Sequence, residues 1–338
     1  MMTRHVAALA ILLLLGCGVG CGGSGDGGTT PRPVDATPPG GQPGGFITYM
    51  VGADVFRIES QAGATPVNVS AALEGFDPGE DESPSVSRNG EWLTISTTRF
   101  DPECDGFSCL AVVEGNLSAG ESVIIGGEPL RPDGRTSISN DGLLIVYPSD
   151  GGPHDIDLFA SRKSGSTWSA PVLLTEDSPH AFNELPVLSS DAERVLFDCG
   201  PVQYGQNGTG VCEVGADGTG FQRIVAPQDN PLGSGSTDAI AHHADYMPDG
   251  GILFEADWDS EQVWMIPGGA ESPIRAIPEH SNDNSPCSLP GGFAASLWLG
   301  RPEGSGVHEL KVMAPDGSEF VVLTPDIDIA DIGMSCHE

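Results

Sequence analysis

Residues Ser137–Thr175 read SISNDGLLIVYPSDGGPHDIDLFASRKSGSTWSAPVLLT. Short apolar runs alternate here with turn residues, a pattern that predicts one four-stranded antiparallel unit. In the turn Asn140-Asp141-Gly142 the glycine supplies the positive φ that a tight hairpin needs. The expected strands are Ser137–Ser139, Leu143–Tyr147, Ile156–Ser161 and Trp168–Thr175.

Weaker copies of this unit recur through the rest of the chain. In each copy a turn precedes a short apolar strand, and in three of the six copies the turn is Asp-Gly or Asn-Gly. The turns lie at Gly45, Asn89-Gly90, Asp141-Gly142, Asp191-Ala192, Asp249-Gly250 and Gly291-Gly292. Their spacings of 45, 52, 50, 58 and 42 residues are within or near the range of blade-type repeats. The sequence therefore predicts an all-β domain of six repeated sheets.

Three strings carry a resemblance to a known family: SPSVSRNGEWLTIS, DIDLFASRKSGSTWSAPVLLT and HELKVMAPDGSEFVVLT. They resemble the WD40-like (PD40) repeat of TolB-like β-propellers, in which a Ser-Pro-Asp-Gly turn precedes an aliphatic strand and a final Leu-Thr ends the unit. The resemblance covers residues 45–338 and implies a six-bladed β-propeller of four-stranded antiparallel blades. It does not specify function, because propellers carry unrelated activities.

The two ends of this domain predict how the ring closes. The first unit begins directly at Phe46 and lacks an opening strand, whereas the segment Asp331–Ser335 resembles the missing one. We therefore expect the C-terminal strand to complete blade one, which leaves no long unpaired sheet edge.

Six of the eight cysteines lie in the repeat region, and an even number in an exported chain favours disulfides. Two pairs would close locally, and the third would join the opening strands of blades six and one. The expected bonds are Cys104–Cys109, Cys199–Cys212 and Cys287–Cys336. A metal site is the rival interpretation, although no Cys-x-x-Cys spacing is present.

The N-terminus predicts export and a lipid anchor. Residues 1–16 carry Arg4 and the ten-residue apolar run Val6–Leu15, which suits a secretory leader and is too short to span a bilayer. The string Leu14-Leu15-Gly16-Cys17 resembles the bacterial lipobox, so Cys17 is the expected lipidation site; an ordinary secreted protein is the alternative. The residue after this cysteine is Gly18, not the aspartate that resemblance to enterobacterial lipoproteins would associate with retention in the inner membrane. We therefore expect an anchor in the outer membrane, with the protein facing the periplasm or the cell surface. Residues 17–44, rich in Gly and Pro, are expected to be a flexible tether.

Charge restricts the partners. The full chain carries 48 acidic and 14 basic residues, a formal net charge of −34. Such a surface repels nucleic acid and anionic lipid headgroups, so we expect no nucleic-acid binding and membrane contact only through the lipid anchor. The expected partner of this monomer is an envelope protein or polysaccharide.

Histidines and carboxylates gather in the connections between one blade's outer strand and the next blade's inner strand. In the propellers that this chain resembles, these loops border the channel mouth. Candidate ligands there are His180, Glu184, His242, His243, Asp245, His280, Asp283, Asp328 and Asp331. Imidazole and carboxylate together suit a divalent cation such as Ca²⁺, Mn²⁺ or Zn²⁺. The alternative is that these side chains only hold turns.

Two functions follow as hypotheses. The first is a non-catalytic, envelope-anchored module that binds a protein or another ligand. The second is a metal-dependent carbohydrate-active enzyme, a lyase or hydrolase with its site at the channel mouth. The string Ser161–Trp168 resembles the Asp-box of sialidases, but Lys163 replaces the aspartate, and no Gly-x-Ser-x-Gly elbow is present. Trp258, between two aspartates, is a candidate for stacking on a sugar. The alternative is that its ring is buried between blades.

Overall fold

The structure is a computed structural model that describes residues 44–73, 80–104, 108–115, 120–203, 207–233, 236–258, 262–268, 274–275, 283–298, 309–314, 320–324, 329 and 334–337. The leader, Cys17 and all but the last residue of the expected tether lie outside these ranges. Among the described residues, no helix has the length and apolar character needed to cross a bilayer.

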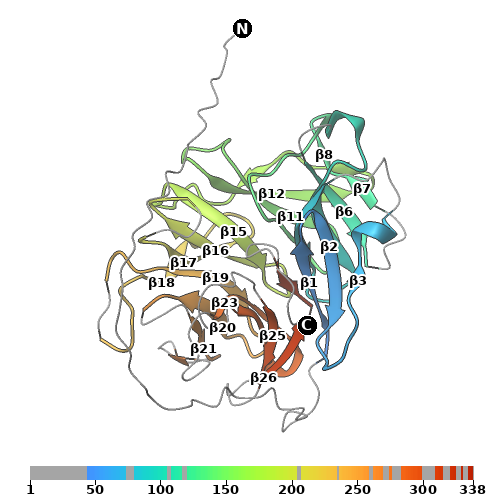
Figure 1. The fold of residues 1–338 in the computed structure, drawn as a ribbon. Coiled ribbons are helices and arrows are strands. Elements are labelled where there is room, and N and C mark those ends of the chain that lie inside the picture. Colours follow the sequence, from blue (N-terminus) through green and yellow to red (C-terminus); the bar gives the residue numbers. More distant parts are fainter. Residues whose placement is uncertain are drawn as a thin grey trace, which may run out of the picture. The chain divides into compact units, whose positions relative to one another are not determined.

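The described chain folds as an all-β, six-bladed propeller, as expected (Figure 1). Blade one consists of β27 (Ser335–Cys336), β1 (Phe46–Val51), β2 (Asp54–Glu59) and β3 (Val67–Asn68). Blade two consists of β4 (Asp81–Val86), β5 (Trp92–Thr97), β6 (Cys109–Glu114) and β7 (Gly120–Ser122). Blade three consists of β10 (Ser137–Ile138), β11 (Leu144–Ser149), β12 (Asp157–Ser164), β13 (Thr167–Trp168) and β14 (Val172–Leu173).

The second half repeats the pattern. Blade four consists of β15 (Phe182–Leu188), β16 (Arg194–Gly200), β17 (Gly210–Gly215) and β18 (Gln222–Val225). Blade five consists of β19 (Ala241–Tyr246), β20 (Ile252–Ala256), β21 (Gln262–Ile266) and β22 (Ile274–Arg275). Blade six consists of β23 (Asp283–Ser288), β24 (Ala294–Trp298), β25 (Glu309–Met313) and β26 (Phe320–Thr324). The hairpin β8 (Ile124–Ile125) and β9 (Glu128–Pro129) and three single-turn 3-10 helices, Ser70–Ala72, Pro102–Cys104 and Pro290–Gly292, lie between strands.

Blade three departs from the expected strands at its outer edge. The single strand expected over Trp168–Thr175 is divided into β13 and β14, which pair separately with β12. Three residues, 169–171, oppose two residues of β12, so one extra residue interrupts the ladder. The proline of this insertion, Pro171, has no N–H to donate, which favours the break at this point.

The hydrophobic core is divided among the interfaces between neighbouring blades. The buried residues form six clusters among the described part of the chain, and each cluster joins two adjacent blades. The cluster between blades six and one includes Ile47, Leu297 and Met334. Because this last interface packs like the other five, hydrophobic burial extends around the whole ring.

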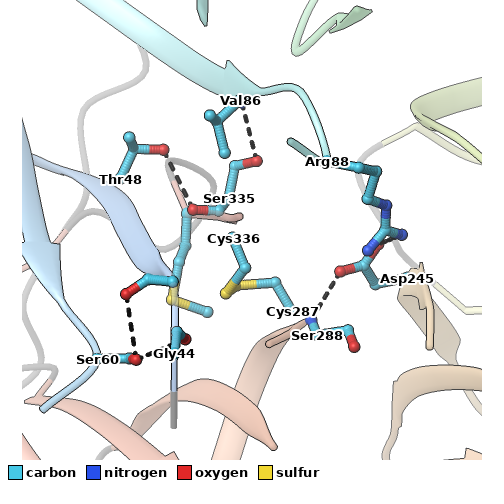
Figure 2. The surroundings of a disulfide bond; sticks show 12 residues. Gly44, Thr48, Ser60, Val86, Arg88, Asp245, Cys287, Ser288, Ser335 and Cys336 are labelled. Carbon is cyan, nitrogen blue, oxygen red and sulfur yellow. Dashed lines mark hydrogen bonds and ion pairs between the residues drawn. A yellow bond between two sulfur atoms is a disulfide. The ribbon is translucent and has the colours of Figure 1, made fainter. Parts of the chain in front are cut away.

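The ring closes through the C-terminal strand. Ser335 and Cys336 pair with Thr48 and Ile47 of β1, so β27 is the inner strand of blade one. Ser335 is the last residue of the anticipated segment, and Cys336 follows it. The Cys287–Cys336 disulfide joins it to β23 of blade six, with the two Cα atoms 5.5 Å apart (Figure 2). The other two disulfides are Cys104–Cys109 and Cys199–Cys212, so all three expected pairs form.

The inner strands share a bulge that shapes the channel. In β4, β15, β19 and β23 the pairing register shifts at a residue with positive φ. The four residues with this conformation are Ser83, Leu185, His243 and Ser285. A bulge re-aims the side chains around it, so these positions depart from regular strand alternation.

Candidate functional site

The inner strands of all six blades enclose a narrow central cavity. One residue from each is Ser85, Ser137, Val187, Asp245, Cys287 and Ser335. The cavity has a volume of about 30 Å³. The space admits water, and it is far smaller than the roughly 300–1,000 Å³ of a usual ligand pocket.

Hydrogen bonds connect successive blades around this cavity. Ser335 Oγ accepts from the amide of Val86 at 3.1 Å, and Ser137 Oγ accepts from the amide of Leu188 at 3.0 Å. At the same position in blade five the acceptor is a carboxylate, because Asp245 Oδ2 accepts from the amide of Ser288 at 2.7 Å. Blade five therefore places a carboxylate where blades one and three place a serine hydroxyl.

Arg88 compensates the charge of Asp245. Its Nη2 contacts Asp245 Oδ1, and each of the two side chains is 9% exposed (Figure 2). Arg88 follows the inner strand of blade two, so the ion pair spans the channel between non-adjacent blades. Since a buried charge is costly unless it is paired, each of these two side chains stabilises the charge of the other across the channel.

A second polar cluster lies at the bulge of blade five. Glu255 on β20 contacts both histidines of the bulge: Oε1 lies 3.0 Å from His242 Nε2, and Oε2 lies 3.1 Å from His243 Nδ1. The same Oε2 accepts from the amide of Ser285 in blade six at 2.8 Å. The two imidazole rings stack, with centroids 4.1 Å apart. One buried carboxylate thus joins two histidines and the next blade.

Asp198 joins this cluster from blade four. Its two carboxylate oxygens accept from the backbone amide of His243 at 3.0 and 3.2 Å. Burial raises the pKa of Asp198, against the effect of His243 and His242, which lower it. Burial also raises the pKa of Glu255, but the two histidines outweigh it and hold that pKa below its ordinary value. Glu255 therefore remains a carboxylate although it is buried.

The expected site residues only partly converge. His242, His243 and Asp245 lie on β19, and Glu184 lies on β15 directly opposite Asp198, so its side chain is on the same face as that of Asp198. All four positions are within inner strands, whereas the sequence analysis placed them in loops. The expectation of loops is wrong here because the inner strands begin early, at Phe182 and Ala241, and continue through the bulge.

His180 does not belong to this cluster. It lies half-buried near the Cys199–Cys212 disulfide, on the other side of blade four, because neighbouring residues of β16 such as Asp198 and Cys199 point to opposite faces. Both sulfurs are in the disulfide, so they cannot hold a metal there. Burial lowers the pKa of His180. The remaining candidates, His280, Asp328, Asp331 and the side chain of Asp283, lie outside the described residues.

Trp258 packs between strands and does not offer a sugar-stacking surface. Its ring is 8% exposed and makes an edge contact with Trp264 at 5.0 Å. Its indole Nε1 donates to the carbonyl of Pro227 at 2.6 Å. Trp258 packs in the cluster that joins blades four and five, so the alternative considered for this residue, burial between blades, is confirmed.

An open hollow of about 310 Å³ lies on blade two, lined by Gly90, Glu91, Trp92, Glu114 and Gly115. The hairpin turns of three blades are linked beside it: Asn140 Oδ1 accepts from the amide of Asn89 at 2.9 Å, and Asn140 Nδ2 donates to the carbonyl of Ser190 at 3.0 Å. These turns form a connected rim at one end of the propeller. We call the surface formed by these linked turns and the hollow the turn rim.

Three residues of the polar clusters were not among the candidates from the sequence: Arg88, Asp198 and Glu255. A usable signal exists for two of them. Asp198 interrupts the apolar run Val195–Cys199, and Glu255 interrupts Ile252–Ala256. Because a charged residue within a short apolar strand needs a buried partner, such interruptions mark polar contacts inside a propeller.

These features define a closed six-bladed propeller whose channel is narrowed by paired polar side chains. No protein-family model matches the chain, and no curated protein matches its sequence. Similar solved structures include TolB from Acinetobacter baumannii, with 13% identity over 88% of this chain and 67% of that chain and a TM-score of 0.63.

Two further structures share the fold. A putative TolB from Agrobacterium tumefaciens has 16% identity over 88% of this chain and 98% of that chain, with a TM-score of 0.59. A chain of a nidogen/laminin complex has 8% identity over 87% of this chain and 99% of that chain, with a TM-score of 0.58. At these identities the likeness shows a TolB-like propeller fold and no particular activity.

Proposed function

We propose that this chain is an outer-membrane lipoprotein, anchored through Cys17, whose propeller is a non-catalytic module that binds an envelope protein or polysaccharide. The narrow channel is the observation that carries this proposal. Its cavity of about 30 Å³ is bordered by Arg88 and Asp245, which engage each other. A propeller whose channel is this narrow and is crossed by an ion pair has its outer surfaces left for recognition.

Three disulfides support an address outside the cytoplasm, because such bonds persist in oxidising compartments. The TolB-like fold agrees with that address. The likeness to a chain of a nidogen/laminin complex supports a binding role, since that structure is by its name a complex of two proteins.

The turn rim is the surface that suits a partner best. Its hollow combines the indole of Trp92 with the carboxylates of Glu91 and Glu114. Leu143, in the neighbouring turn, is 45% exposed. The hydrogen bonds between turns hold this surface in one arrangement, which reduces the entropy lost on binding. Aromatic and acidic groups together fit a partner that presents basic side chains or amino sugars.

An affinity pull-down from envelope extracts, followed by direct binding to the purified partner, tests the proposal. Reversing the charge of Glu91 with Glu91→Lys should weaken binding by about tenfold or more, as loss of an interface charge pair does. Glu128→Lys makes the same charge change at an exposed residue outside the hollow and should bind like the wild type. Equal binding by all three proteins would contradict a role for the turn rim, and failure to capture any envelope partner would contradict the binding function.

The metal-dependent carbohydrate-active enzyme remains the second candidate, because Asp198, His242 and His243 lie close together. It predicts turnover of polyanionic sugars that is lost in His242 or His243 variants. If the full chain leaves such sugars intact in the presence of Mn²⁺, Ca²⁺ or Zn²⁺, this candidate fails.

A further inference from the structure

We propose that Asp198, His242 and His243 form a binding site for a single transition-metal ion, and that zinc is the ion that fits best. Each residue offers one ligand atom, and the three atoms lie within 4.8 Å of one another. Points so spaced have a common centre no more than about 2.8 Å from each, and zinc takes nitrogen and oxygen ligands at about 2.0–2.2 Å. Side-chain movements of under about 1 Å would therefore complete the site.

The bulge of blade five brings the two histidines together. Successive residues of a regular strand point to opposite faces, so adjacent histidines would normally be separated. In β19 the register shifts between His242 and Asp245, His243 has a φ of 51°, and the rings stack at 4.1 Å. The same bulge carries serine or leucine in blades two, four and six. The bulge thus recurs in four blades, and among these four it is blade five that places two imidazoles on one side.

Glu255 gives the histidines the orientation of metal ligands. Its two oxygens contact one nitrogen of each ring, at 3.0 Å and 3.1 Å. Histidines that bind metals usually donate their second N–H to a carboxylate in this way, which fixes the tautomer and the ring orientation. Here one carboxylate serves both ligands.

The donor set selects among metals. Two imidazole nitrogens and one carboxylate suit zinc, with its fourth position open to water or to an oxygen of a partner. Calcium prefers six to eight oxygens, which these residues cannot supply. The side chain of His242 is 15% exposed and that of Glu255 is 4% exposed, so an ion would reach the cluster more easily from the side of His242. This site is independent of the turn rim and goes beyond the proposed binding function.

Isothermal titration of the full chain with ZnCl₂, in a large excess of CaCl₂ to occupy surface carboxylates, tests the proposal. One zinc ion per chain is expected. Asp198→Asn and His243→Gln should weaken binding by about a hundredfold or more, and Glu255→Gln by about 10–100-fold, as for other residues that orient metal ligands. His180→Gln is the matched control, since it removes a half-buried histidine outside the cluster, and should bind zinc like the wild type.

Cobalt substitution gives a second measurement on the wild-type chain, in case a cluster variant does not fold. Co²⁺ bound at a four-coordinate site absorbs strongly in the visible range, and we expect such a spectrum that zinc displaces. Absence of zinc binding by the folded wild-type chain would overturn the proposal. So would zinc binding that is weakened equally by Asp198→Asn and by His180→Gln, or a cobalt spectrum typical of six-coordinate, solvated ions.

Discussion

Cys287 and Cys336 are 49 residues apart in the sequence, and their disulfide joins the inner strands of blades six and one. In the chain-entropy model, a loop of this length stabilises the fold by about 4 kcal/mol, against about 2 kcal/mol for a loop of five residues. Replacing both cysteines by serine should therefore lower the free energy of unfolding more than the same change at Cys104 and Cys109. Urea unfolding of the two double variants makes the comparison. A larger loss at Cys104 and Cys109 would contradict a closing role for Cys287–Cys336.

Because Arg88 and Asp245 form an ion pair, mutations of the two residues should have non-additive effects on the free energy of unfolding. Arg88→Met leaves the buried carboxylate of Asp245 without its guanidinium and should cost about 3 kcal/mol, as for other broken buried pairs. Adding Asp245→Ser should recover much of this loss, because serine is the residue that accepts the equivalent amide in blades one and three.

Urea unfolding of the single and double variants measures this coupling. Glu59→Gln is the control, since the Arg57–Glu59 pair has side chains 31% and 54% exposed. Exposed pairs contribute about 1 kcal/mol or less, so this change should have little effect. A double variant no more stable than Arg88→Met alone would show that the charge of Asp245 is not what destabilises the single variant.

The turn of blade three predicts an acid-sensitive contribution to stability. The hydroxyl of Ser139 and the amide of Leu143 donate to Asp141 and hold the pKa of its carboxyl below the ordinary value. The folded-state pKa is thus lower than the unfolded one, so the carboxylate stabilises the fold at neutral pH, and this contribution is lost as the pH falls below about 4.

Asp141→Asn isolates this contribution, because Asn89 accepts the equivalent hydrogen bond from Ser87 in blade two at 2.8 Å. The variant should be less stable than the wild type in urea at pH 7, and the difference should shrink at pH 3. A stability difference that does not change between the two pH values would exclude the charge of Asp141 as its source.

Lipid anchoring at Cys17 is a prediction from the sequence alone. The wild-type chain should partition into the detergent phase and carry the mass of an acylated N-terminal cysteine. Cys17→Ser should move to the aqueous phase without changing the propeller's unfolding curve, because the expected tether separates the two regions. A wild-type protein found in the aqueous phase would instead indicate an ordinary secreted chain.

The sequence predicts the scaffold well because the repeat is local. Each blade needs a turn such as Asn140-Gly142 and a few apolar residues after it, and both are visible in any one copy. Closure is also readable, since Phe46 lacks a preceding strand and Cys336 has a partner in blade six. The polar clusters are different. Asp198 and His243 belong to separate blades, and only the bulge brings His242 and His243 to one side, so neither contact follows from spacing along the chain.

Site-specific photo-crosslinking in living cells tests whether the propeller binds an envelope partner through the turn rim. A photoreactive residue at Leu143 lies on the rim, and one at Val202, in the loop at the other end of blade four, is the control. Both positions are exposed, at 45% and 40%. We expect a discrete cross-linked envelope product at position 143 and none at position 202. No product at position 143, or the same products at both positions, would contradict binding through the turn rim.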